Sequence, residues 1–584
     1  MPKLLREVLL VTGISTFLTY LSFIWLGVQF ERISTAYFGD YGDTLFNSWT
    51  LHQAIENLLQ RPNNLGYSPI FYSYPQSFAY TIAPYGIAIT VLPFHLLTGS
   101  NIILTYNVYL FATFVLTAVA GYLLIRHLTG AAFAPALFGA LMIAFSQFRF
   151  QHFVQIESLS FHLLLFALYG FHKLLQTLSI RWMVFTSIFV TLMLTTSGYL
   201  TVMFITSASV IALYVWFKRR ELLTARRVAF VIGAAVLAGL LAYPLLSFRL
   251  HNPDFMRGTS IGENIYYSSS LNGWFTGYSQ LYFDQVLPYR EEVSVFLGMI
   301  PLVLALFAWK ERELIAAKTS KPSPSIFSTR EIISLYGLII FTGYVLALGP
   351  VARLSGIPIF PMPYLLIELL PLFSNTRVPA RFIILAIIGT AVLGAMFLDY
   401  LSHHLSPRQY RVCLALILFT LTLELIPPVV HKPIGLIAAA QIPIQQRVRY
   451  PITPTLEEDF PVYAWLATQP AGTPIIQYPD EPHRIQYILN LPLHGQPMFN
   501  GHGSFLPEGW QRFNWETFPD RAGIRELQSK GIRYLLVHHE YMSPEIIEQF
   551  QQRMDQFPDC FTYYQTFATV AVYQINASCE SVNA

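Results

Sequence analysis

Uncharged apolar segments of about twenty residues recur from the N-terminus to about residue 430. A helix of that length can cross the roughly 30 Å of hydrocarbon in a bilayer. The charge content agrees, because only 12% of the 584 residues are Asp, Glu, Lys or Arg, about half the share found in soluble globular proteins. We therefore predict an α-helical polytopic membrane protein rather than a soluble enzyme.

The positions of the basic loops predict the topology. Apolar runs lie near residues 8–28, 79–97, 101–125, 131–147, 159–178, 182–197, 199–217, 228–247, 293–309, 331–349, 382–400 and 411–430. The first run lacks a signal-peptide cleavage site, so we expect an uncleaved helix. The positive-inside rule places the basic loop 218–227 in the cytoplasm. If 79–97 also crossed the membrane, this loop would fall outside, so we expect 79–97 to be a juxtamembrane helix on the outer surface.

This topology has about eleven spanning helices, a cytoplasmic N-terminus and a C-terminus on the outer face. Hydropathy falls after about residue 432, so we predict a transmembrane domain over 1–431 and a small extracytoplasmic α/β domain over 432–584. The location we expect is the plasma (inner) membrane of a bacterium. In the second domain we expect helices at 460–468, 522–530 and 544–557 and strands at 474–478, 533–538, 561–565 and 569–575.

Charge and cysteine content limit the partners. A net charge of +3 without a basic block excludes a nucleic-acid partner, which requires a clustered cationic face. Three cysteines are too few for a disulfide scaffold. Cys560 and Cys579 can pair if their region faces an oxidising compartment, and remain thiols if it does not.

The first outer loop carries two acidic residues, Asp40 and Asp43, around a glycine-rich turn. A carboxylate on a flexible turn at the membrane surface is suited to act as a general base or a metal ligand. The alternative is a solvated turn, since Asp–Gly pairs are common in loops.

The second outer loop crowds Arg149, His152, Gln155 and Glu157 between two apolar helices. Ionisable groups are costly at such positions and therefore suggest a functional site. His152 and Glu157 are candidate ligands of a divalent cation or a phosphate, although two ligands without a third make a weak metal signature. The alternatives are an ion pair of Arg149 with Glu157 and a contact of His152 with lipid phosphate.

Two further outer segments hold charged candidates. Glu292 precedes a predicted helix, where an acid can simply stabilise the helix dipole. Arg377 and Arg381 lie four residues apart at the outer mouth of another helix, and two guanidinium groups at that spacing suit a phosphate or pyrophosphate headgroup. Phosphate of the surrounding membrane lipid is the alternative ligand.

Taken in order, these segments resemble the GT-C superfamily of polytopic glycosyltransferases, which use polyprenyl-phosphate sugars as donors. The resemblance rests on five short segments and is closest to uncharacterised bacterial members. The five segments are Gly42–Trp49, the segment ending in Glu157-Ser158-Leu159, Glu292 before Phe296-Leu297-Gly298, Arg377–Phe382 and Gly531–Val537. Relatives often have Asp-x-Leu where this chain has Glu157-Ser158-Leu159.

The resemblance implies an integral membrane glycosyltransferase that transfers a hexose or pentose, with inversion, to a lipid, glycan or protein acceptor on the outer face. Asp43, with Asp40 as its rival, would act on the acceptor hydroxyl. The residues implied to bind the donor phosphate are Arg149, Arg377 and Arg381. Glu157 and His152 would hold a metal or phosphate, and Glu292 is a further candidate. Glutamate in place of aspartate leaves open whether Mg²⁺ or Mn²⁺ is needed.

Two other functions stay open. A transporter or lipid-linked glycan flippase would show inverted repeats and charged residues near the midplane of its spans. The polar clusters of this chain lie instead in outer loops, which favours a surface site. A non-catalytic relative, in which the acidic loop is only structural, is the second alternative.

Overall fold

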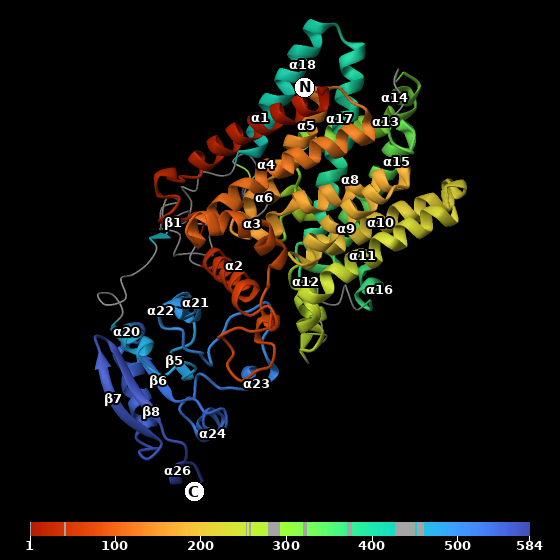
Figure 1. Ribbon diagram of the computed structural model, residues 1–584. Helices are drawn as coiled ribbons and strands as arrows, with labels where there is room; N and C mark the ends of the chain where they lie inside the picture. The colour runs from red at the N-terminus through yellow and green to blue at the C-terminus, as the bar shows by residue number, and fades with distance from the viewer. Residues whose placement is uncertain are drawn as a thin grey trace. The chain divides into compact units, whose positions relative to one another are not determined.

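The computed structural model describes residues 2–39, 42–252, 254–255, 259–277, 279, 292–318, 324–370, 376–426, 450–451 and 461–583. The chain forms two compact units (Figure 1). Unit 1 contains Met1–Ser34, Leu104–Pro244 and Met256–Arg449, and unit 2 contains Thr35–Ile103, Leu245–Phe255 and Tyr450–Ala584. Each unit therefore combines segments that are far apart in the sequence.

Unit 1 is helical. Its helices are α1 (Lys3–Trp25), α4 (Ile102–Thr129), α5 (Phe133–Ala144), α6 (Gln147–Gln151), α7 (Ile156–Leu159), α8 (Phe161–Thr177), α9 (Ile180–Leu194), α10 (Gly198–Lys218), α11 (Ala225–Leu250), α12 (Ile261–Tyr266), α13 (Met299–Lys310), α14 (Arg312–Lys318), α15 (Thr329–Ala347), α16 (Tyr364–Glu368), α17 (Ile383–His404) and α18 (Pro407–Leu425). Strands β2 (Val351–Leu354) and β3 (Ile357–Pro361) form an antiparallel hairpin. The ends of α4 and α11 extend into unit 2.

The helices agree with a multi-pass membrane protein. Within the described residues, eight helices are long and apolar enough to cross a bilayer. They cover 3–25, 102–129, 133–151, 156–177, 198–218, 225–250, 329–347 and 379–404. The other three runs that we expected to span form α9, α13 and α18. The α-helical membrane fold is thus confirmed, while the count of eleven spans stays a prediction.

Helix α17 lies at the centre of unit 1, where its residues Ile383–Met396 are all buried, and it packs against α5, α13 and α15. Glycines permit this close packing. A Cβ atom at Gly139 of α5 would lie 2.7 Å from the carbonyl oxygen of Ala391, and one at Gly389 would lie 3.0 Å from that of Tyr336. Small residues allow membrane helices to approach closely, and here they hold the start of α17 in a defined position.

Unit 2 combines the first long loop with the C-terminal part of the chain. Its helices are α2 (Asp43–Gln60), α3 (Tyr85–Leu97), α20 (Pro461–Ala467), α21 (Arg484–Leu489), α22 (Leu491–His494), α23 (Glu508–Gln511), α24 (Arg521–Ser529), α25 (Pro544–Met554) and α26 (Glu580–Asn583). With 13 residues, α3 is about 20 Å long and shorter than a bilayer core. This length agrees with the juxtamembrane helix that we expected at 79–97.

Unit 2 contains a mixed four-stranded sheet in the order β5-β6-β8-β7 (Figure 1). Strand β5 (Ile475–Tyr478) runs parallel to β6 (Tyr534–His538), whereas β8 (Val570–Ile575) is antiparallel to β6 and to β7 (Phe561–Phe567). A separate antiparallel bridge joins β1 (Ala36–Tyr37) to β4 (Tyr450–Pro451). The helices and strands expected in the C-terminal region are present, each within a few residues of its predicted bounds.

The core of unit 2 contains side chains from both of its main segments. Phe71 contacts Trp510 edge to face, with ring centroids 5.6 Å apart. The backbones also pair, since Tyr72 N donates to Met498 O at 3.0 Å and Met498 N donates to Pro69 O at 2.8 Å. Residues 35–103, which we had grouped with the membrane domain, thus fold together with the C-terminal segment. The predicted boundary at 431/432 lies outside the described residues.

Cys560 and Cys579 form a disulfide bond, with Cα atoms 5.0 Å apart. The bond links the end of the loop before β7 to the segment before α26. Of the two alternatives left open by the sequence, pairing is therefore the one found.

Candidate functional site

The candidate site of unit 1 lies where α17 begins. Arg381 belongs to a short 3₁₀ helix, Pro379–Phe382, that leads directly into α17, and its side chain is only 7% exposed. Its Nε donates to Glu292 Oε2 at 3.2 Å, and its Nη2 donates to Glu292 Oε1. This two-point contact between a guanidinium and a carboxylate is the strongest type of side-chain ion pair, so the two residues form one rigid unit.

Glu292 is held from a second side by His152, whose Nε2 lies 3.0 Å from Glu292 Oε2. The backbone of Glu292 has a φ of +63°, a left-handed conformation that non-glycine residues rarely adopt. Burial alone would raise the pKa of Glu292, but the positive charges of Arg381 and His152 outweigh it and hold that pKa well below its ordinary value. Glu292 is therefore an ionised carboxylate at neutral pH.

His152 has an acceptor at each ring nitrogen. Its Nδ1 lies 2.8 Å from the carbonyl oxygen of Phe148, and its ring stacks on the Phe148 ring with centroids 3.8 Å apart. In this arrangement neither nitrogen of His152 is available to a metal ion.

Arg381 also reaches the second outer loop. Its Nη1 donates to Ser158 Oγ at 3.1 Å, and its Nη2 donates to Gln155 Oε1 at 2.8 Å. Ser158 in turn donates to Glu157 Oε1 at 3.2 Å, so Glu157 is connected to Arg381 through one hydroxyl. The guanidinium carbon lies 4.5 Å from the ring centroid of Tyr199, close enough for a cation–π contact.

The structure therefore joins Glu292, Arg381, His152 and Glu157 into one network. The sequence singled out all four but did not show that they meet. Tyr199 was missed, because a tyrosine at the end of an apolar helix is more often an interface anchor.

Arg149 is separate from this network. It is completely buried, and its Nη1 donates to Leu159 O at 2.6 Å and to Thr117 Oγ1 at 3.0 Å. Its Nη2 donates to Thr113 Oγ1 at 3.0 Å, and its guanidinium lies 4.3 Å from the centroid of Phe114. Arg149 thus ties the second outer loop to α4. This geometry favours a structural role over the predicted contact with donor phosphate.

Arg377 differs from Arg381 in its exposure. Its side chain is 41% exposed, its guanidinium lies 5.2 Å from the ring of Tyr267, and its Nη1 is 3.9 Å from Glu263 Oε1. A weak ion pair at the surface contributes little to stability. Arg377 is therefore the predicted phosphate-binding arginine that a ligand can reach without breaking a buried ion pair.

Asp43 lies in unit 2, in the first turn of α2. An acid at this position stabilises the helix dipole, which is the structural alternative to a role as a base. Phe46 and Trp49, from the same sequence motif, belong to the core of unit 2. Asp40, its predicted rival, lies outside the described residues.

The described residues contain one group of three His, Cys, Asp or Glu side chains close enough to share a metal ion, namely Asp559, Cys560 and Cys579. The two cysteines of that group are bonded to each other and offer no thiolate. His152 and Glu157 are not part of such a group among these residues. A requirement for Mg²⁺ or Mn²⁺ thus stays a prediction.

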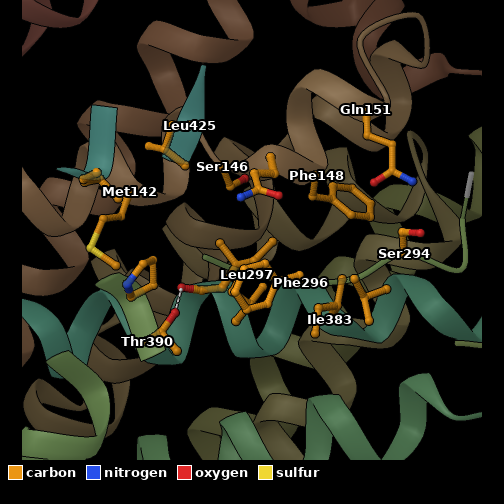
Figure 2. A pocket seen from close by; sticks show the side chains of 15 residues that line it. Met142, Ser146, Phe148, Gln151, Ser294, Phe296, Leu297, Ile383, Thr390 and Leu425 are labelled. Carbon is orange, nitrogen blue, oxygen red and sulfur yellow. Dashed lines mark hydrogen bonds between the residues drawn. The ribbon is translucent and has the colours of Figure 1, made fainter. Parts of the chain in front are cut away.

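A narrow cavity of about 20 Å³ is lined by residues close in sequence to the network, among them Gln151, Ser294 and Ile383 (Figure 2). Three buried polar atoms at this cavity, Ser146 Oγ, Gln147 Oε1 and Gln151 Nε2, have no hydrogen-bond partner within the described part of the chain. The volume is enough for about one water molecule and too small for a sugar. We therefore regard this cavity as a site for a water molecule and not as the site for a sugar.

Solved structures resemble the whole chain. The single-particle cryo-EM structure of the arabinofuranosyltransferase AftD from Mycobacteria is 13% identical, with a TM-score of 0.57, and the match covers 98% of this chain and 40% of AftD. A mutant of AftD matches with 13% identity, a TM-score of 0.55 and coverages of 99% and 42%. ArnT from Cupriavidus metallidurans, crystallised with undecaprenyl phosphate, has 11% identity, a TM-score of 0.46 and 98% coverage of both chains.

The likeness to AftD shows the fold that the resemblance to the GT-C superfamily implied. The chain spans about two fifths of the length of AftD. No curated protein matches the sequence. A family model described as a domain of unknown function, DUF6311, matches residues 87–423, which is more than half of the chain. The protein therefore belongs to the DUF6311 family.

Proposed function

We propose that this protein is a membrane glycosyltransferase that transfers a sugar from a polyprenyl-phosphate donor to a lipid, glycan or protein acceptor, with inversion. The observation that carries the proposal is the buried network of Arg381, Glu292 and His152 at one end of α17. The network fixes the segment that begins α17, and Arg377, four residues before Arg381, offers an exposed guanidinium there that suits the phosphate of a lipid donor. The GT-C fold supports the same class of enzyme.

In this proposal Arg377 contacts the donor phosphate, because its exposed guanidinium is only weakly paired. Negative charge builds on that phosphate as the sugar bond breaks, and a nearby cation lowers the barrier. Arg381 acts as a positioning residue, since Glu292, Ser158 and Gln155 already bind its guanidinium. It would hold the start of α17 and the second outer loop in fixed positions next to each other.

Asp43 is the proposed base that takes the proton from the acceptor hydroxyl. Inversion requires that the acceptor hydroxyl attacks the sugar on the face opposite the departing phosphate. Asp40 is its rival. If a divalent cation takes part, Glu157 is the better candidate ligand, because both ring nitrogens of His152 already have partners.

We also propose that the protein lies in a bacterial plasma membrane with unit 2 on the extracytoplasmic side. The disulfide between Cys560 and Cys579 supports this orientation, because disulfides persist in oxidising compartments and are rare in the cytosol.

Release of sugar from a panel of radiolabelled polyprenyl-phosphate sugars tests the proposed activity. Purified protein is incubated with a membrane-lipid acceptor extract, with Mg²⁺ or Mn²⁺ and with a chelator. We expect release by the wild type, a loss of about 10²-fold or more in Asp43→Asn, and a smaller loss in Arg377→Gln. Glu313→Gln, an exposed acid of α14, is the matched control and should retain activity.

The outcomes separate the alternatives. Release that survives Asp43→Asn would overturn the role of Asp43 and favour Asp40. No release from any donor, together with donor-lipid movement across proteoliposomes, would indicate a flippase. Neither release nor movement would indicate a non-catalytic member of the fold.

A further inference from the structure

A second, larger cavity lies in unit 1, at the end of α17 opposite Arg381. Its volume is about 620 Å³, within the range of small-molecule binding sites. The ends of several helices form its wall, including the start of α1 and the last turns of α4, α8 and α17.

The two sites lie at opposite ends of the same helix. Arg381 precedes α17 directly, and His403 and His404 at the end of α17 line the second cavity. A helix of 22 residues is about 33 Å long, which is about the thickness of the hydrocarbon core. The second cavity therefore lies about the thickness of the hydrocarbon core away from Arg381 and is not part of the Arg381 network.

The lining of the cavity is rich in basic side chains. They are Lys3, Arg126, His127, Lys173, His403 and His404. Two acids, Glu7 and Asp399, also line it, but both already have protein donors. Glu7 Oε2 accepts from Tyr122 Oη at 2.8 Å and pairs with Arg126 at 3.2 Å, and Asp399 Oδ1 accepts from Ala132 N at 2.7 Å.

His127 is the clearest sign that something binds here. It is only 4% exposed, and within the described residues neither of its ring nitrogens has a hydrogen-bond partner. Its ring contacts Tyr169 edge to face, with centroids 5.7 Å apart. A buried polar group without a hydrogen-bond partner destabilises the folded protein, so a ligand or water in the cavity would supply the contact that this imidazole lacks within the described residues.

Lys173 lies close to His127 on the same wall. Its Nζ is 5.8 Å from the ring centroids of both Tyr169 and Trp182. Among the residues that the structure describes, it takes part in no ion pair. As far as the described residues show, the cavity therefore holds a lysine without a counter-charge beside an imidazole without a hydrogen-bond partner, while both of its acids already have protein partners.

We propose that this cavity binds a phosphate-bearing anion. An ammonium group, a hydrogen-bonding imidazole and the nearby exposed imidazoles of α17 offer donors from several directions, which suits the several acceptor oxygens of a phosphate. The phosphate can belong to the headgroup of an anionic lipid in the leaflet on this side, or to a soluble phosphate compound. The proposal does not depend on the proposed glycosyltransferase activity.

Two binding measurements on the purified full chain distinguish the sources. For a soluble ligand, inorganic pyrophosphate is titrated calorimetrically into protein in phosphatidylcholine nanodiscs. For a lipid, native mass spectrometry counts the lipids retained from mixed phosphatidylcholine and phosphatidic acid. We expect pyrophosphate binding in the first case, or preferential retention of phosphatidic acid in the second.

Lys173→Gln and His127→Asn should each weaken the observed binding by about tenfold or more, because each removes one contact to a charged ligand. Lys218→Gln removes the same charge at the exposed end of α10, outside the cavity, and should bind as the wild type does. Lys3→Gln, at the exposed start of α1, replaces Lys173→Gln if that variant fails to fold.

Two results would overturn the proposal. One is a wild-type protein that neither binds pyrophosphate nor prefers phosphatidic acid. The other is an equal loss of binding in Lys173→Gln and Lys218→Gln, which would indicate a general effect of surface charge.

Discussion

Arg381 and Glu292, 89 residues apart in the sequence, form a buried ion pair with hydrogen bonds from two guanidinium nitrogens. Removing one partner of a buried pair leaves an uncompensated charge, at a cost of about 3–5 kcal/mol. We expect Glu292→Gln and Arg381→Gln each to lower the thermal unfolding temperature strongly. The double variant should lose less than the sum of the two, since neither charge is then left alone. Additive losses in a double-mutant cycle would contradict the pairing.

Arg149 should affect stability rather than donor binding. Replacing Arg149 with Met keeps much of the packing volume but removes its bonds to Thr113, Thr117 and Leu159. We expect a loss of about 1–3 kcal/mol in unfolding free energy, while the KM for the lipid donor in the folded fraction stays near that of the wild type. Arg377→Gln is the matched comparison, with the opposite pattern. A donor KM raised in Arg149→Met without a loss of stability would restore its predicted role in phosphate binding.

Asp480 of unit 2 should make folding depend on pH. Burial raises the pKa of Asp480 to about 6, although Arg484, 3.2 Å away, and Asn500 act in the other direction. The folded state therefore holds this proton more tightly than the unfolded chain, so Asp480 favours folding most below its ordinary pKa of about 3.9. That contribution is lost as the pH rises to about 6.

The unfolding temperature, followed by tryptophan fluorescence between about pH 4 and 7, measures this effect. Compared with Asp480→Asn, the wild type should lose stability as the pH rises through this window, by roughly 3 kcal/mol in total. Parallel curves for the two proteins would show that Asp480 does not titrate there.

The disulfide of unit 2 should stabilise that unit. Cys560 and Cys579 are 19 residues apart, and closing a loop of about that length stabilises the folded state by about 3 kcal/mol. We expect Cys560→Ser with Cys579→Ser to unfold unit 2 at lower temperature, as measured by limited proteolysis during heating. Cys413→Ser, which changes the free thiol, should have little effect. Free thiols at all three cysteines in protein isolated from membranes would contradict both the bond and the proposed extracytoplasmic orientation.

The sequence by itself determined the membrane class and the positions of most elements. Helix length and hydropathy are local properties, so a run such as 382–400 predicts α17 without knowledge of its neighbours. The same holds for the alternating patterns of β7 and β8 in unit 2, which predicted strands close to those found.

Only the tertiary structure decided which charged residues meet. His152 and Glu292 are 140 residues apart, and no local pattern indicates that the His152 ring contacts the Glu292 carboxylate. Nor does a local pattern indicate that Arg149 donates hydrogen bonds to α4. Nor did the sequence indicate that residues 35–103 fold with the C-terminal segment, or that a basic cavity lies at the far end of α17. Hydrophobic periodicity specifies which face of an element is buried, whereas the partner of each polar group depends on how distant elements pack together.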